Sequence, residues 1–148
     1  MPVITARHWT AQYEWYAHRM IGEKEGLSKE LCDTLARGEK LGAFCLTEPH
    51  TGSDASNLRT RAVRKGNGWV LNGVKQFITS GRTADMALVF AVTDPASSKR
   101  GISCFIVPTR TSGYRVASVE KKLGQKSSDT CQIAFEDCQV GADALLGE

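Results

Sequence analysis

The sequence lacks any long uninterrupted run of apolar residues. No stretch of its 148 residues approaches the ~20 apolar residues that a helix needs to cross a bilayer. No apolar core precedes a small-residue cleavage site near the N-terminus, so a secretory signal is not expected. The net charge of +3 is too small to argue for nucleic acid or an anionic membrane as a partner. The sequence therefore predicts a globular chain with no membrane span and no nucleic-acid partner.

Motifs for nucleophilic catalysis and metal binding are also missing. There is no G-x-S-x-G elbow, and the three histidines all lie within residues 1–50, where His8 and His18 have no second ligand at metal spacing. The five cysteines are odd in number and contain no C-x-x-C pair. Most lie among apolar neighbours, where a free cysteine acts as a small hydrophobe, and this usage fits a reducing compartment. We expect no metal site and no nucleophilic triad.

The N-terminal part of the sequence predicts two helices. A second, shorter helix should begin after Ser28, a good N-cap, and end where Arg37 is followed by Gly38. The first helix is indicated by aromatic and apolar residues at helical spacing, which we interpret as a packing stripe: Trp9, Tyr13, Tyr16 and Met20.

From Leu41 onward the pattern is typical of strands. The segments share apolar runs or period-two alternation, and they are residues 41–46, 62–65, 69–71, 74–79, 86–92, 102–107, 114–119 and 131–135. Gly66-Asn67-Gly68 predicts a hairpin turn, and Asn72-Gly73 predicts a second tight turn or a bulge. Strands at spacings of about ten residues without helical periods between them predict an antiparallel barrel or sandwich. The fold class is mainly β with a helical N-terminal piece.

Two polar clusters, the basic run 59–65 and the turn after the strand 41–46, each allow a functional and a structural interpretation. The basic run 59–65 could suggest a nucleic-acid strip, but no aromatic residues interleave for base stacking, so a solvated strand edge is the better account. After the strand 41–46, Pro49 and Gly52 force a turn rich in hydroxyls. Unpaired N–H groups there could receive an anion or the polar edge of a ring, although local chemistry alone favours a surface turn.

Four ordered blocks carry a resemblance to a known family. They are LGAFCLTEPHTGSDASNLRT, GWVLNGVKQFITSG, GISCFIVP and KKLGQKSSDTCQIAFEDCQV, followed by LLGE at the end. Together they resemble the middle domain of the acyl-CoA dehydrogenase family from about Gly38 to Glu148. The resemblance implies that residues 1–40 are a helical remnant of an N-terminal domain. It implies that residues 41–148 form a β-barrel that binds FAD and acyl-CoA. It also implies the cytoplasm or the mitochondrial matrix as location.

Enzymes of this family oxidise the Cα–Cβ bond of an acyl-CoA to a trans-2-enoyl-CoA and pass electrons to an electron-transferring flavoprotein. The resemblance implies two cofactor-binding segments and places Ser53 beside the FAD pyrophosphate or the acyl-CoA. Thr47 would add a hydroxyl at the pyrimidine edge of the flavin, and the Thr79 hydroxyl would point toward flavin N5. The implied cofactor-binding residues are Phe44, Cys45, Leu46, Thr47, Gly52, Ser53, Phe77, Ile78 and Thr79.

The sequence departs from the family at several points. His50-Thr51 replace small residues, Phe77 replaces a common tryptophan, and Lys126 replaces a frequent arginine. The family's catalytic glutamate lies in a C-terminal helical bundle, which the resemblance places after Glu148. We therefore assign no catalytic residue, interpret Glu48 as structural, and expect these residues alone to be inactive. A homo-oligomer is implied for the full-length enzyme. The alternative is a non-catalytic module that binds flavin or a partner.

Overall fold

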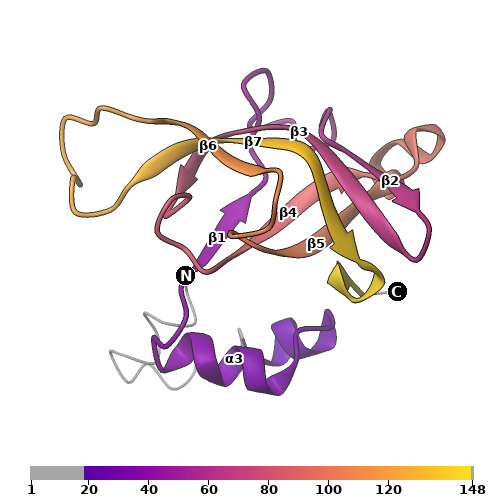
Figure 1. The fold of residues 1–148 in the computed structure, drawn as a ribbon, viewed down its shortest axis with the longest axis horizontal. Coiled ribbons are helices and arrows are strands. Elements are labelled where there is room, and N and C mark those ends of the chain that lie inside the picture. The colour runs from indigo at the N-terminus through magenta and orange to yellow at the C-terminus, as the bar shows by residue number, and fades with distance from the viewer. Residues whose placement is uncertain (1–18, 148) are drawn as a thin grey trace.

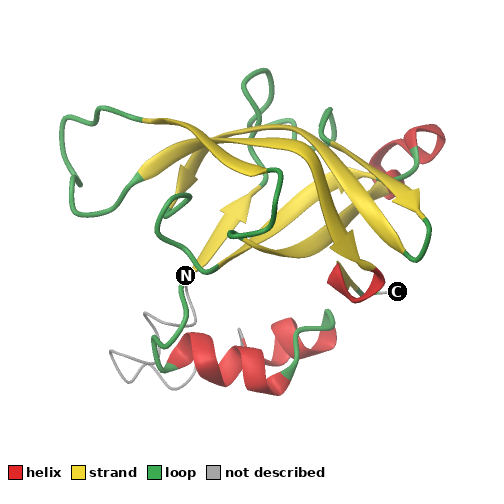
Figure 2. Cartoon of the chain, in the orientation of Figure 1, coloured by secondary structure: helices red, strands yellow, loops and turns green. Residues whose placement is uncertain are grey.

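The described chain is organised around one eight-stranded sheet. A short helix lies beside the sheet (Figures 1 and 2). The structure is a computed structural model and describes residues 19–147. Residues 19–24 are helical. The remaining elements are α3 (Lys29–Ala36), β1 (Gly42–Cys45), β2 (Arg61–Lys65), β3 (Gly68–Thr79), β4 (Met86–Val92), the 3-10 turns η1 (Pro95–Gly101), β5 (Ile102–Pro108), β6 (Tyr114–Val119), β7 (Thr130–Gly141), η2 (Ala142–Ala144) and β8 (Leu145–Leu146).

Helix α3 has the ends that its sequence predicts. The Ser28 hydroxyl accepts a hydrogen bond from the Leu31 amide at 3.2 Å, which satisfies one free donor of the first turn. Gly38 follows with φ +70°, the left-handed conformation that ends many helices. Of the expected stripe Trp9, Tyr13, Tyr16 and Met20, only Met20 lies among the described residues. No helix among residues 19–147 has the length and apolar character needed to span a bilayer.

The strand order is β6-β7-β3-β2-β4-β5-β8, and β1 pairs with β4. The mainly β, antiparallel-rich fold is confirmed, because five of the seven strand pairs are antiparallel. Parallel pairing was not foreseen: β1 lies parallel to β4 over four residues, and β2 meets β4 in parallel at Arg61 and Val92. The sheet is strongly curved, and hydrogen bonding leaves it open between β6 and β8 in the part of the chain described.

The long antiparallel pair β3–β7 contains two register shifts. The first lies between Leu71 and Gly73, so Asn72-Gly73 forms a bulge within one continuous strand and not a second turn. Gly73 has φ +152°, and a Cβ there would lie 2.4 Å from Thr60 Oγ1. Only glycine allows the chain to approach so closely at this point. The second shift lies between Lys75 and Ile78.

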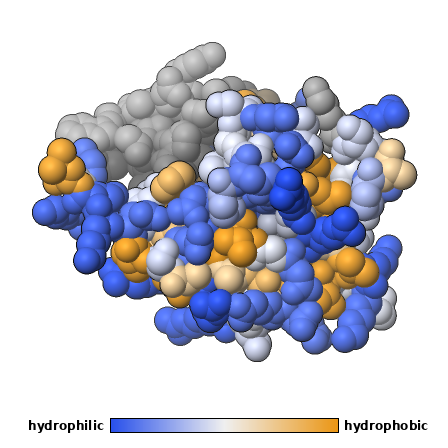
Figure 3. Space-filling view, turned by 90° about the horizontal axis from the view of Figure 1, so that it is seen from above, coloured by the Kyte–Doolittle hydropathy of each residue, from blue (hydrophilic) through white to orange (hydrophobic). Residues whose placement is uncertain are grey.

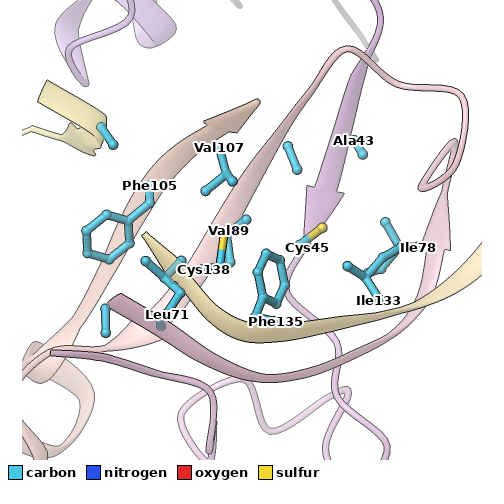
Figure 4. Close-up of a cluster of buried hydrophobic side chains, with 14 of the residues drawn as sticks. Ala43, Cys45, Leu71, Ile78, Val89, Phe105, Val107, Ile133, Phe135 and Cys138 are labelled. Carbon is cyan, nitrogen blue, oxygen red and sulfur yellow. The ribbon is translucent and has the colours of Figure 1, made fainter. Parts of the chain in front are cut away.

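The core lies within the curve of the sheet and is built from buried side chains of β1, β2, β3, β4, β5 and β7, with partly buried residues of β6 and β8 packed against it (Figure 4). Cys45, Cys131 and Cys138 are fully buried in it, and all five cysteines of the chain are free. Cysteine here acts as a small apolar side chain, as its sequence neighbours predict. On the face seen in Figure 3, hydrophobic residues form separate patches among hydrophilic ones. The exposed large hydrophobic residues include Phe44, Val63, Phe77 and Leu123.

Candidate functional site

The two segments that the sequence singles out lie side by side. The first leaves β1 and turns at residues 47–54, and the second is the end of β3. The Gln76 amide donates to the Thr47 carbonyl at 2.8 Å, which joins the segments directly. The turn closes on itself because Glu48 and Thr51 exchange backbone hydrogen bonds at 2.9 and 3.1 Å.

A buried ion pair lies beneath this junction. Lys75 Nζ lies 2.8 Å from Glu48 Oε1, and both side chains are almost fully excluded from solvent. The Glu48 carboxylate also accepts hydrogen bonds from the Arg59 amide at 2.7 Å and the Thr60 amide at 3.0 Å. Glu48 therefore binds β3 and the approach to β2 to the same turn, and its structural interpretation is confirmed.

The environment favours the charged form of Glu48. Burial by itself would raise the pKa of the carboxyl, but hydrogen bonds from the Lys75 ammonium and from the Thr60 and Arg59 amides outweigh it and hold the pKa below its ordinary value. Burial lowers the pKa of Lys75, and the nearby carboxylate opposes that shift. An isolated charge at either position would be costly, so each side chain depends on the other.

Lys75 makes a second contact that the sequence did not reveal. Its Nζ donates to the Leu46 carbonyl at 3.1 Å, while the neighbouring Gln76 amide holds the Thr47 carbonyl. Two successive carbonyls at the end of β1 are thus held by two successive residues of β3. The Thr47 amide, in contrast, has no acceptor among the described residues. A free N–H at the end of a strand is the kind of donor that can bind an anion or a carbonyl edge.

The bulge at Lys75–Ile78 turns an aromatic side chain outward. Phe77 has φ +57° and is 63% exposed, whereas Ile78 next to it is buried. Bulges often redirect a side chain next to a site, and non-glycine residues in this conformation are strained. The Gln76 side chain anchors the bulge: its amide nitrogen donates to Glu120 at 2.8 Å, and its oxygen accepts from Gln132 at 2.6 Å.

The predicted site residues divide into three groups by exposure. Cys45 and Ile78 point into the core (Figure 4), so only their backbone atoms could contact a ligand. Leu46 and Thr47 are half-buried. Five are exposed at the surface of the two segments: Phe44, Gly52, Ser53, Phe77 and Thr79. Phe44 also packs against Phe90, with ring centroids 5.1 Å apart.

A hollow of about 460 Å³ lies beyond the end of β3. Its wall includes Glu120 and Asp129, which are tied to the second segment through the Gln76 side chain and the Ser80 amide. Asp129 accepts from the Arg82 amide at 2.9 Å and from the Thr83 hydroxyl at 2.6 Å, so the carboxylate shapes the loop and is not free for chemistry.

Comparison with known proteins shows the family to which the chain belongs. The family described as "Acyl-CoA dehydrogenase, middle domain" matches residues 43–138. The chain belongs to the acyl-CoA dehydrogenase family. An acyl-CoA dehydrogenase of Bacillus subtilis is 48% identical over 114 residues, which cover 77% of this chain and 30% of that protein. The human mitochondrial short-chain specific acyl-CoA dehydrogenase is 47% identical over 111 residues, which cover 75% of this chain and 27% of that enzyme.

Solved structures of the acyl-CoA dehydrogenase family share the fold. A glutaryl-CoA dehydrogenase from Mycobacterium smegmatis, described as a complex with FADH2, superposes with a TM-score of 0.75 at 37% identity. The match covers 88% of this chain and 33% of that one. The chain thus spans about a third or less of the length of these relatives.

Proposed function

We propose that this chain is the FAD- and acyl-CoA-binding part of an acyl-CoA dehydrogenase that forms a trans-2-enoyl-CoA. The observation that carries the proposal is the junction of the two segments by the Gln76–Thr47 hydrogen bond. The junction places the outward Phe77 side chain of β3 beside the unpaired Thr47 amide of the turn after β1. In this proposal residues 41–148 are the middle domain and residues 1–40 the remnant of a helical one.

The residues present fit a flavin. Phe77 offers an exposed aromatic face held rigidly by a bulge, and the Thr47 amide offers a donor for a carbonyl at the ring edge. Ser53 would contact the pyrophosphate or the acyl-CoA, and the Thr79 hydroxyl would face flavin N5. When bound, FAD would supply the acceptor for the hydride that leaves the substrate. The chain's own part is to bind and orient both molecules.

The remaining partners follow from the family. In the full-length enzyme the electron acceptor is an electron-transferring flavoprotein, and the enzyme is a homo-oligomer. The location is the cytoplasm or the mitochondrial matrix, which agrees with five free cysteines and with a human relative described as mitochondrial. Glu48 and Asp129 are not free to remove a proton, because several donors engage each of these carboxylates.

Titration with FAD tests the proposal. We expect the flavin absorbance and fluorescence to change as the protein binds FAD, and Phe77→Ala to weaken binding about tenfold because it removes the exposed aromatic face. Val63→Ala is the matched control, since Val63 is 61% exposed on β2, away from the two segments. Absence of FAD binding by the wild-type protein, or equal affinities for all three proteins, would contradict the proposed site. A saturated acyl-CoA should leave the bound flavin oxidised in these 148 residues alone.

A further inference from the structure

The fully buried Lys75 is unusual for a strand of a small sheet. Its side chain has 0% exposure, although lysine is almost never fully buried unless it is paired. Burial of an ion pair is weak evidence for stability, because apolar residues of similar volume often stabilise a protein as well or better. The position of Lys75 therefore calls for a reason beyond holding the sheet together.

The ammonium group reaches beyond its carboxylate partner to the main chain. Besides Glu48 at 2.8 Å, it donates to the Leu46 carbonyl at 3.1 Å. Lysine carries three donors on one nitrogen, so a single side chain can hold both groups at once. Leu46 is the first residue after β1, and no other described residue donates to its carbonyl. Lys75 thus determines which way this carbonyl points.

The direction of that carbonyl fixes the direction of the next amide. In a planar trans peptide the C=O of Leu46 and the N–H of Thr47 point in opposite directions. Because the carbonyl points inward to a fully buried nitrogen, the Thr47 N–H points away from it, and it has no acceptor among residues 19–147. The hydrogen bond from Gln76 to the Thr47 carbonyl prevents the following peptide from rotating.

We propose that Lys75 is a positioning residue for FAD, which holds the Leu46 carbonyl inward so that the Thr47 N–H is presented to the pyrimidine edge of the flavin. This inference rests on the proposed FAD binding. Lys75 does not touch the flavin; it acts through one peptide unit. A preoriented donor at this edge strengthens as negative charge accumulates there on reduction, so Lys75 also favours the reduced over the oxidised cofactor.

The double variant Lys75→Met/Glu48→Gln tests the inference without leaving an unpaired buried charge. The Arg59 and Thr60 amides donate to different oxygens of Glu48, so the glutamine keeps an acceptor for one of them, and methionine keeps the length of the lysine stem. We expect a folded protein in which the Thr47 amide resonance is displaced and FAD binds about tenfold more weakly. The affinity for reduced FAD should fall by a further factor of about ten. This loss lowers the midpoint potential of the bound flavin by about 30 mV for a two-electron couple. Lys65→Met, which changes an exposed lysine of β2, should alter none of these values.

The outcomes separate this inference from the function on which it rests. A wild-type protein that binds no FAD overturns both. A wild-type protein that binds FAD, beside a folded double variant with unchanged affinity and midpoint potential, overturns the role of Lys75 alone. If the double variant does not fold, the wild-type protein still decides by nuclear magnetic resonance. A Thr47 amide resonance that shifts on titration with FAD supports the inference, and one that does not move contradicts it.

Discussion

At the scale of single residues, Phe77 is the least expected side chain of the sheet. It combines 63% exposure with φ +57°, although a left-handed conformation costs a non-glycine residue about 1–2 kcal/mol. Nothing in the packing of the described residues compensates for this strain, since the side chain leaves the core. Strain of this kind gathers at ligand-binding segments, where the surrounding structure enforces it. The bulge, anchored by the Gln76 side chain, supplies that enforcement here.

Replacing Phe77 should therefore separate stability from binding. We expect Phe77→Gly to raise the free energy of unfolding of the flavin-free protein by up to about 1 kcal/mol, because glycine accepts the positive φ, and to weaken FAD binding. Val63→Gly is the control: it removes an equally exposed side chain from β2, where φ is not positive, and should cost about 0.5–1 kcal/mol. Urea denaturation measures both. A parallel loss of stability in the two variants would show that Phe77 is not strained.

At the scale of elements, β3 is the strand on which the site depends. It pairs with β2 on one side and β7 on the other, and its two bulges adapt it to the turn after β1. The first bulge brings the Gly73 backbone against Thr60, and the second re-aims Phe77. Regular pairing along the whole strand would place neither contact. The irregular positions of β3 thus permit one close backbone contact and redirect one side chain at the candidate site.

Gly73 should tolerate no side chain. A methyl group there would lie 2.4 Å from Thr60 Oγ1 and 2.6 Å from Thr60 Cα, and the second neighbour belongs to the backbone. We expect Gly73→Ala to lower the free energy of unfolding by about 2 kcal/mol or more, measured by urea denaturation. Gly124→Ala, at a position with open space around it, should change the free energy by less than about 0.5 kcal/mol. Equal midpoints for the two variants would mean that the strand can shift away from Thr60.

Most elements of this sheet could be predicted from the sequence, since their signals are local. Alternation and glycine turns located the strands, and Ser28 and Gly38 located the ends of α3. The parallel neighbours of β4 could not be predicted, because pairing between distant segments leaves no local pattern. Lys75 was also missed, since a lysine in a strand normally marks the solvent face. The resemblance placed the two segments, but only the structure shows that β3 holds them together.

At the scale of the whole molecule, one buried carboxylate connects three separate parts of the chain. Glu48 in the turn after β1 binds Lys75 of β3 and the backbone at Arg59 and Thr60. These contacts span the site and the centre of the sheet, so loss of the carboxylate charge should loosen the molecule as a unit. These contacts also hold the pKa of Glu48 below its ordinary value, and the free energy of unfolding should therefore depend on pH.

Acid should therefore weaken the fold through Glu48. Because its pKa in the folded state lies below the ordinary 4.5, the stabilisation is complete above that pH and is lost as the pH falls through the folded-state value. At neutral pH we expect Glu48→Gln to cost about 3–5 kcal/mol, since it leaves Lys75 buried without its counter-charge. The difference in free energy of unfolding between Glu48→Gln and the wild-type protein should become smaller as the pH falls. Urea denaturation at several acidic pH values measures this difference. Glu25→Gln, at an exposed position, should follow the wild-type curve, and a constant gap for Glu48→Gln would contradict the assignment.

The pairing of β3 with β7 also sets the order in which the molecule can be completed. Residues 68–79 pair with residues 130–141, so the chain must be synthesised through β7 before β3 gains its second neighbour. Until then one edge of β3 stays open, with its backbone donors and acceptors unpaired. Closing so long a loop is slow compared with forming a local hairpin such as β2–β3. Until β7 pairs with it, the open edge of β3 can therefore form hydrogen bonds with strands of other chains.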